Sequence, residues 1–362
     1  MKVYIITVLL TILFSGLAQS VDQPRLSVRN ELQIVHTQTA NALFFLTIAV
    51  LVFVGGFRYY VGTDYGAYYY GYKEYARSLG QAILTLSEPG YPLISRIAIF
   101  IHDDGATAIF LAELVTIWPA MKVIYRHTDR LLLASLLFIF LGCWDGSFNG
   151  VRQYLAATML FCGYEALETR NLRKYLFWVF IAFLFHRSAI VMAALFFVVY
   201  RKVNTRNLLL IFSGSILVLL LYGQVLTIAG WITESDYSLK DEYAAHAVNT
   251  LRVLAACAPA VVFVVLLWNK RKDEQITFYL NLLVLHAAFR VATMNSALLY
   301  RIGIYTTLFQ VLAIPELLKR VSPSLRKTIT TAMIPLYAFF WWCEIHGSSN
   351  LSNFRWIWER LY

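Results

Sequence analysis

Long apolar runs recur along almost the whole chain, and they constrain its fold more than any other feature. Runs of roughly 12 to 22 residues follow one another from end to end, and a membrane-spanning helix needs about 20. Hydrophobic residues make up 59% of the sequence and charged residues 14%, whereas about a quarter of a soluble domain is charged. The sequence therefore predicts an all-α fold, a polytopic transmembrane helical bundle.

Hydropathy predicts about twelve membrane spans and one shorter helix. Residues 91–101 are too few to cross a bilayer, so we expect a short re-entrant or interfacial helix there. Residues 1–20 also resemble a signal peptide, but we favour an uncleaved first span. The expected spans are 2–19, 40–57, 106–124, 131–146, 150–168, 174–186, 188–200, 207–223, 250–268, 275–294, 297–314 and 327–343.

No linker, soluble domain or internal repeat is evident, so residues 1–362 are expected to form a single integral membrane domain. Its two long loops on the extracytoplasmic side are 58–105, with the partial helix, and 224–249. The second loop contains an acidic, tyrosine-rich stretch, 233–243, that could contact a polar substrate or simply be solvated.

Basic residues assign the loops to the two sides of the membrane. In and near the loops of one side, Lys and Arg outnumber Asp and Glu by 10, which equals the net charge of the whole chain. The positive-inside rule assigns this side to the cytoplasm. The membrane topology accounts for the basic net charge, so we expect no nucleic-acid partner. This topology requires two short helices over 174–200 that meet near His186 and Arg187, because one span would place the next basic cluster outside. The basic segments are 20–39, 122–130, 165–174, 201–206, 269–274 and 316–327.

Several polar residues fall at outer helix ends in this topology. Ionisable groups at membrane depth are costly, so they are candidates for function. Arginine suits bidentate phosphate contacts, a carboxylate or imidazole can act as a general base, and tyrosine faces suit sugar rings. Anchoring at the membrane interface is the alternative for each arginine and tyrosine. The ionisable candidates are Arg58, Asp64, Glu88, Asp145, Arg152, His186, Arg290 and Arg301.

These motifs together resemble the EpsG family of bacterial exopolysaccharide polymerases, relatives of the Wzy-type polymerases of O-antigen-like repeat units. The tail 350–362, rich in Trp and Arg, departs from the family pattern. The matching pieces are Arg58 with 61–65, 88–91, 149–156, 186–189 and 301–305, in the family order.

The resemblance implies a GT-C-like glycosyltransferase of the bacterial plasma (inner) membrane. Such an enzyme polymerises oligosaccharide units carried on polyprenyl diphosphate, such as undecaprenyl diphosphate, into exopolysaccharide at the outer face. Membrane lipid, a chain-length regulator and a flippase are the expected partners. The sequence has no DxD motif and no cysteine cluster, so arginines would replace a metal and no cofactor is expected. By analogy the reaction is a single inverting displacement.

Within this interpretation each candidate receives a role. Asp64 is the first choice for the base, with His186 and Glu88 behind it. The diphosphate ligands are expected to be Arg58, Arg152 and Arg301, followed by Arg290 and Gln153. The glycan contacts are expected from Tyr65, Tyr91, Tyr300 and Tyr305.

Two functions of other classes remain open from the residues alone. A flippase or transporter of a lipid-linked saccharide predicts polar residues through the midplane and pseudo-symmetric halves. A membrane acyltransferase acting on surface glycans would need a path for a cytoplasmic acyl donor, and the inner loops offer few catalytic candidates for it.

Overall fold

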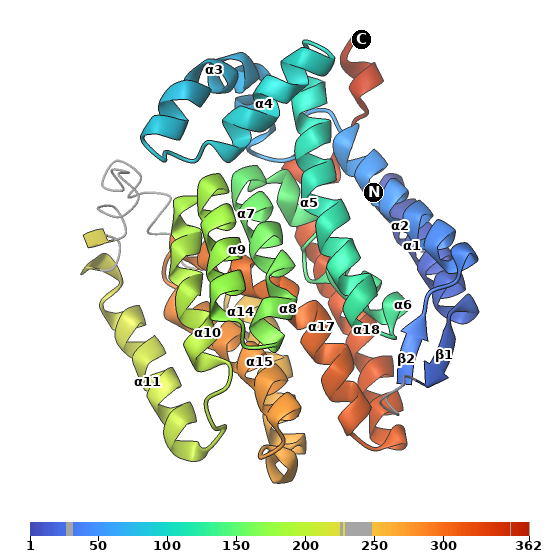
Figure 1. Ribbon diagram of the computed structural model, residues 1–362, viewed down its shortest axis with the longest axis vertical. Helices are drawn as coiled ribbons and strands as arrows, with labels where there is room; N and C mark the ends of the chain where they lie inside the picture. Colours follow the sequence, from blue (N-terminus) through green and yellow to red (C-terminus); the bar gives the residue numbers. More distant parts are fainter. Residues whose placement is uncertain (27–31, 225–226, 229–247, 348, 362) are drawn as a thin grey trace. The chain divides into compact units, whose positions relative to one another are not determined.

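The computed structural model describes residues 1–26, 32–224, 227–228, 248–347 and 349–361. Over these residues the regular secondary structure is helical apart from one two-stranded ribbon (Figure 1). The chain divides into two compact units. Unit 1 consists of Met1–Thr158 and Lys327–Tyr362, and unit 2 of Met159–Arg326.

Unit 1 contains the first seven α-helices and the C-terminal segment. The ribbon pairs β1 and β2 as antiparallel strands. The elements are α1 (Lys2–Val21), β1 (Gln23–Leu26), β2 (Leu32–Val35), α2 (Gln38–Gly56), α3 (Tyr65–Leu84), α4 (Gly90–Ile101), α5 (Gly105–His127), α6 (Leu131–Phe140), the 3₁₀ helix η1 (Asp145–Phe148), α7 (Val151–Cys162, which ends in unit 2), α18 (Pro323–Gly347, which begins there), α19 (Ser349–Ser352) and η6 (Ile357–Leu361).

Helix α1 shows how a membrane helix packs inside unit 1. It lies beside α2 and α6 (Figure 1). Large apolar side chains such as Ile5, Leu9 and Leu13 stay exposed. Small and hydroxyl-bearing residues suit close contact between helices in lipid, where apolar side chains gain little from burial. The buried stripe consists of Tyr4, Thr7, Thr11, Ser15 and Ala18. The exposed face therefore fits lipid, and the stripe faces the protein.

Helices α3 and α4 occupy the segment that hydropathy assigns to a loop. Helix α4 confirms the partial helix expected at 91–101, but α3 was not expected. Tyr65, Tyr68, Tyr72 and Ala76 are buried at helical spacing along α3, which packs against α4 and α5. Tyrosine scores low on hydropathy scales, so this amphipathic helix gives only a weak signal.

The C-terminal segment docks on the loop that follows α2. Arg58 and Trp356 form an isolated β-bridge, and the amide of Ile357 donates to the Phe57 carbonyl at 2.8 Å. Arg360 donates to Asp104 at 2.5 Å and to the Tyr69 hydroxyl at 3.1 Å. The tail is therefore an integral part of unit 1.

Unit 2 is built around α15, which packs against α11, α14 and α17. The predicted break near His186 is confirmed, because α9 ends at Phe185 and η2 begins at Arg187, with His186 extended between them at φ −156°. The second short segment consists of a 3₁₀ helix followed by a short α-helix. The elements are α8 (Tyr164–Glu168), α9 (Leu172–Phe185), η2 (Arg187–Ala194), α10 (Leu195–Val198), α11 (Thr205–Leu220), α14 (Thr250–Leu266), η4 (Trp268–Lys270), α15 (Glu274–Ala292), α16 (Ala297–Tyr300), η5 (Arg301–Gly303) and α17 (Ile304–Arg320).

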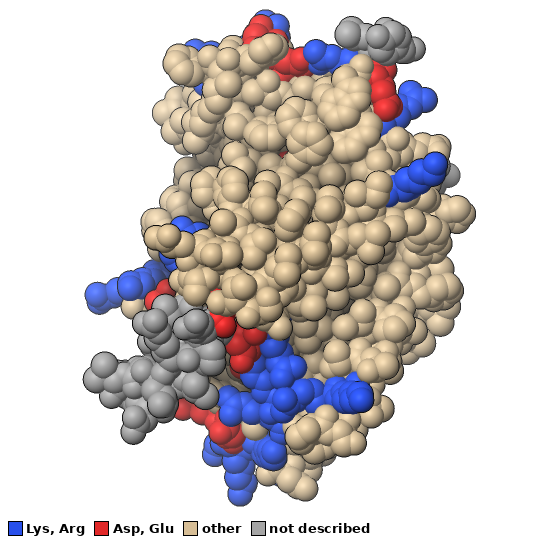
Figure 2. Space-filling model, turned by 90° about the vertical axis from the view of Figure 1, so that its right-hand side faces the viewer, with Lys and Arg blue, Asp and Glu red and all other residues tan. Residues whose placement is uncertain are grey.

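Some of the helices are long and apolar enough to cross a membrane, and others are shorter. On the face drawn in Figure 2, wide areas carry no charged side chain. The count of about twelve spans and the GT-C-like arrangement stay predictions. Six helical segments of the described part are long and apolar enough to cross a membrane: Lys2–Val21, Gln38–Gly56, Gly105–His127, Leu131–Phe148, Glu274–Ala292 and Ala297–Arg320. Four shorter apolar helices are Gly90–Ile101, Arg187–Val198, Thr205–Leu220 and Thr250–Leu266.

Candidate functional site

In unit 1, Arg152 and Glu88 form a partly buried ion pair. Arg152 is the second residue of α7, and its Nη1 donates to Glu88 Oε2 at 2.5 Å. Its Nε donates to the Tyr68 hydroxyl at 3.2 Å. The Arg152 side chain is 34% exposed and that of Glu88 13%, so the arginine is the more accessible partner of the pair. Two predicted site residues, distant in sequence, therefore lie in contact.

The backbone presents Glu88 in an unusual conformation. Its φ is +53°, in the left-handed region that residues other than glycine rarely adopt. Such conformations persist only where the surrounding structure holds them, and they concentrate at functional sites. The turn between α3 and α4 thus aims a carboxylate at the start of α7.

Tyrosines form the support of this pair. The Tyr91 ring is fully buried and meets the ring of Tyr68 edge-on, with centroids 4.7 Å apart. The Tyr91 hydroxyl donates to the Tyr68 carbonyl at 3.4 Å. Tyr91 was predicted to contact glycan, but here it lies beneath Tyr68, and it is Tyr68 that touches Arg152.

Asp64 lies on the same side of unit 1 as Tyr68. It is the half-buried N-cap residue of α3, and its Oδ1 accepts from the Thr63 hydroxyl at 3.2 Å. The Thr63 amide donates to Asn149 Oδ1 at 2.7 Å, which ties this loop to the turn before α7. Burial raises the pKa of Tyr68, Arg152 opposes that rise, and the charge of Asp64 adds to it. Asp64 and Arg152 therefore act on one hydroxyl.

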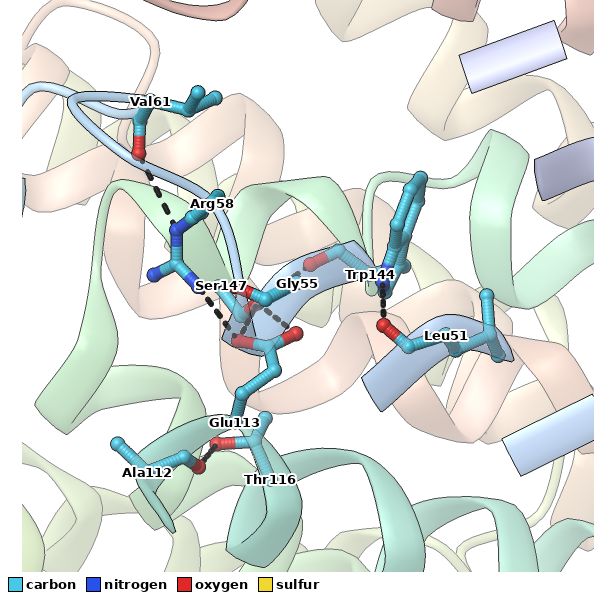
Figure 3. Close-up of polar contacts among 9 residues, drawn as sticks. All are labelled: Leu51, Gly55, Arg58, Val61, Ala112, Glu113, Thr116, Trp144 and Ser147. Atoms are coloured by element: carbon cyan, nitrogen blue, oxygen red, sulfur yellow. Dashed lines mark hydrogen bonds and ion pairs between the residues drawn. The ribbon is translucent and has the colours of Figure 1, made fainter. Parts of the chain in front are cut away.

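Arg58 has different surroundings from those expected of a phosphate ligand. Figure 3 shows its guanidinium facing Glu113 of α5, with Nη1 and Oε2 3.3 Å apart. Arg58 also donates to the carbonyls of Gly55 and Val61, and Ser147 donates to both carboxylate oxygens of Glu113 at 3.2 Å. Arg58 is 1% exposed. Its charge is paired with Glu113 inside unit 1. Tyr65, whose ring lies near the Arg58 guanidinium, is also fully buried.

In unit 2, Arg290 is held by a group of neutral acceptors. Its Nε donates to His286 Nε2 at 3.3 Å, Nη1 to the Tyr300 carbonyl at 3.1 Å, and Nη2 to the Thr307 hydroxyl at 3.0 Å. The guanidinium carbon lies 4.2 Å from the centroid of the Tyr300 ring. Arg290 and Tyr300 were both predicted as site residues, and the fold brings them into contact.

The remaining predicted residues of unit 2 are His186, Arg301 and Tyr305. His186 and Arg301 are half-buried, at the α9–η2 break and in η5. Tyr305 is fully buried, and its hydroxyl lies 2.8 Å from the Ser188 hydroxyl, two residues after His186.

Two further candidates belong to unit 1. Gln153, in α7, is buried and follows Arg152 in the chain. Asp145 accepts from Trp341 Nε1 at 2.9 Å.

Sequence reasoning missed several residues of these networks, among them Glu113, Ser147, His286 and Thr307. Two of them carried a signal. Glu113 is an acidic residue in the middle of an apolar run, and His286 precedes Arg290 by four residues, which places both on one helix face. The acidic stretch 233–243 lies outside the described residues.

Comparison with known proteins gives one match. A family model described as the EpsG family matches residues 41–357, which is most of the chain and includes every predicted site residue. No curated protein and no solved structure matches the chain.

Proposed function

Since the chain belongs to the EpsG family, a Wzy-type polymerase family, we propose that it is a membrane glycosyltransferase that joins oligosaccharide repeat units carried on polyprenyl diphosphate. The observation that carries the proposal beyond the family is the Arg152–Glu88 pair. It combines a partly exposed guanidinium, suited to a diphosphate, with a sheltered carboxylate, suited to accept a proton.

The pair suggests how donor binding prepares the reaction. In the free protein Glu88 is the partner of Arg152. A diphosphate carries more charge than one carboxylate and offers several oxygens to the planar guanidinium. It therefore displaces Glu88 as the partner of Arg152, and Glu88 becomes available as a base.

The proposed step is a single displacement at the anomeric carbon. The acceptor hydroxyl oxygen forms a bond to that carbon as the bond from the carbon to the diphosphate oxygen breaks. The electron pair leaves with polyprenyl diphosphate, whose growing charge Arg152 stabilises. The hydroxyl proton passes to Glu88, with Asp64 as the second candidate base. Backside attack makes the transfer inverting.

Cationic side chains support a metal-independent reaction. In unit 1, Arg152 would supply positive charge of the kind that a metal provides in other glycosyltransferases. Arg290 and Arg301 are kept as candidate phosphate ligands of unit 2 by itself. Gln153 is kept as a weaker ligand, and His186 as a third candidate base. Arg58 is left out of the diphosphate site because Glu113 already takes its charge.

The cellular setting of the proposal follows the family and the sequence. The enzyme resides in the bacterial plasma membrane, uses undecaprenyl-diphosphate-linked units and works at the extracytoplasmic face, where it builds an exopolysaccharide. The charge distribution along the sequence and the helices of membrane-spanning length support that setting. A flippase that delivers the units and a regulator of chain length are the proposed partners.

Incubation of the purified protein with undecaprenyl-diphosphate-linked repeat units tests the function directly. We expect a ladder of products, each longer by one repeat unit, on gel electrophoresis with carbohydrate detection. Single units that remain unchanged would contradict the proposal. Units that instead move between leaflets of a proteoliposome, without a ladder, would identify a flippase.

A further inference from the structure

We propose that His286 is a positioning residue, which presents Arg290 to the diphosphate of the lipid-linked substrate without neutralising its charge. The identity of the anion rests on the proposed function. The geometric part rests on the network around Arg290 in unit 2, where every acceptor is neutral: a ring nitrogen, a carbonyl and a hydroxyl.

Arg290 differs from three arginines of unit 1 that are each paired with a carboxylate. Arg58 faces Glu113, Arg152 faces Glu88, and Arg360 faces Asp104. Within the described ranges, no Asp or Glu pairs with Arg290, although it is half-buried at the end of a helix of membrane-spanning length. An uncompensated charge is costly in such a place. The site is therefore suited to bind an anion such as a phosphate group.

The hydrogen bonds fix the tautomer of His286. Arginine stays protonated, so Nε of Arg290 must donate, and Nε2 of His286 must be the unprotonated, accepting nitrogen. The ring therefore carries its proton on Nδ1, which lies 2.8 Å from the Thr306 hydroxyl. That hydroxyl accepts from Nδ1 and donates its own hydrogen to the Gly303 carbonyl at 3.0 Å. All three groups are satisfied only when the imidazole is neutral.

A second chain of hydrogen bonds ends at the same carbonyl. Arg290 Nη2 donates to the Thr307 hydroxyl, which donates to the Gly303 carbonyl at 2.9 Å. Gly303 also makes room for the guanidinium, since a Cβ there would lie 2.6 Å from Arg290 Cζ. The guanidinium is thus fixed from two sides against the start of α17.

The fixed guanidinium keeps its capacity for an anion. A guanidinium has five N–H donors, and the contacts made within the described residues use three of them. Two N–H groups and the full positive charge remain for phosphate oxygens. A carboxylate in place of His286 would hold the arginine equally well but would cancel the charge.

This reasoning gives a matched pair of variants, His286→Gln and His286→Glu. The two side chains have nearly the same shape, and both offer an oxygen to Arg290 Nε. The probe is undecaprenyl diphosphate in lipid nanodiscs that hold the full chain, with neutral undecaprenol as the blank. We expect His286→Gln to retain most of the affinity and His286→Glu to weaken it by at least tenfold. Gln275→Glu adds the same charge at an exposed position of α15, beside Arg320, and should bind like the wild type.

The outcomes separate the inference from the proposed function. Equal affinity of His286→Gln and His286→Glu would overturn the inference, whatever the protein catalyses. A clear difference in binding, in a protein that gives no product ladder, would support the inference and refute the polymerase. A ladder whose apparent KM for the lipid-linked unit rises in His286→Glu, but much less in His286→Gln, supports both.

A second pair covers the case in which His286→Glu does not fold. Thr306→Val removes the group that fixes the tautomer, whereas Thr306→Ser keeps the hydroxyl. We expect Thr306→Ser to bind undecaprenyl diphosphate nearly as the wild type does and Thr306→Val to bind it several-fold more weakly. Equal affinities in two variants of wild-type thermal stability would overturn the inference.

Discussion

Arg58 Nη1 and Glu113 Oε2 lie 3.3 Å apart inside unit 1, where the two side chains are only 1% and 3% exposed. This buried ion pair links the end of α2 to the middle of α5 and carries the loop that leads to Asp64. Its partners Ser147 and the Val61 carbonyl complete the hydrogen bonds of both charges. The pair therefore supports the site in unit 1 without being accessible to a substrate.

We predict that Glu113→Ala lowers the free energy of unfolding of the detergent-solubilised protein by about 3–5 kcal/mol, because it leaves the buried charge of Arg58 unpaired. Thermal unfolding followed by fluorescence measures the loss. Asp103→Ala is the control, since it breaks an exposed pair with Lys73 and should change stability little. Equal losses of unfolding free energy in the two variants would show that the buried Arg58–Glu113 pair contributes no more to stability than an exposed pair.

Arg152→Ala should slow polymerisation by about 10²–10³-fold, the usual cost of removing one group that stabilises developing negative charge. In cells, single lipid-linked repeat units should accumulate while the protein stays in the membrane. Arg96→Ala, at an exposed arginine of α4, is the matched control and should leave chain length normal. Arg301→Ala tests the corresponding role in unit 2 with the same readout. Normal polymer in both strains would refute Arg152 and Arg301 as diphosphate ligands.

The assignment of the base is tested by Glu88→Gln and Asp64→Asn. Glu88→Gln keeps the shape of the side chain but cannot accept the hydroxyl proton, so we expect kcat to fall by about 10²–10⁴-fold. KM for the lipid-linked donor should fall or stay the same, because a neutral amide competes less with the diphosphate for Arg152. Asp64→Asn should have a smaller effect. Initial rates at saturating lipid-linked substrate measure both. The opposite order would make Asp64 the base, as the sequence alone suggested.

The attachment of the C-terminal segment should depend on pH. Burial raises the pKa of Asp104, but the Ala106 amide and Arg360 together hold this pKa below its ordinary value. The contact is therefore fully present above a pH of about 4, near the ordinary pKa of Asp, and is lost as the pH falls through the lowered value. Hydrogen exchange of the amides around Ile357 should rise there, and in Asp104→Asn at pH 7. Asp103→Asn should leave that exchange unchanged, and protection that persists in Asp104→Asn would assign the docking to the backbone bonds alone.

Gly303→Ala should disturb Arg290 directly. The new Cβ would lie 2.6 Å from Arg290 Cζ, so the guanidinium must leave its place against Tyr300 and Thr307. We expect binding of undecaprenyl diphosphate to weaken at least several-fold in a protein that still folds. Gly214→Ala, where a Cβ meets nothing within 4 Å, is the control. Wild-type affinity in Gly303→Ala would mean that the position of Arg290 is not important for the anion.

Local patterns predicted much of the secondary structure. The run that ends at Gly56, the partial helix after Glu88 and the break at His186 all follow from apolar length and neighbouring charge. Helix α3 was missed because its buried face consists of tyrosines, whose hydroxyls lower the hydropathy that a search for spans detects. The predicted number of crossings, the outer face and the roles of the site residues stay predictions.

The sequence by itself determined that this chain is a helical membrane protein with the ordered motifs of the EpsG family, because helix length, apolar content and motif order are properties of short stretches. Only the tertiary structure decided which charges are neutralised and which are not. Arg58 and Arg152 look alike as residues at the ends of apolar runs, yet one is buried against Glu113 and the other stays partly exposed beside Glu88. Those partners lie 55 and 64 residues away along the chain, so packing, rather than local sequence, assigns them.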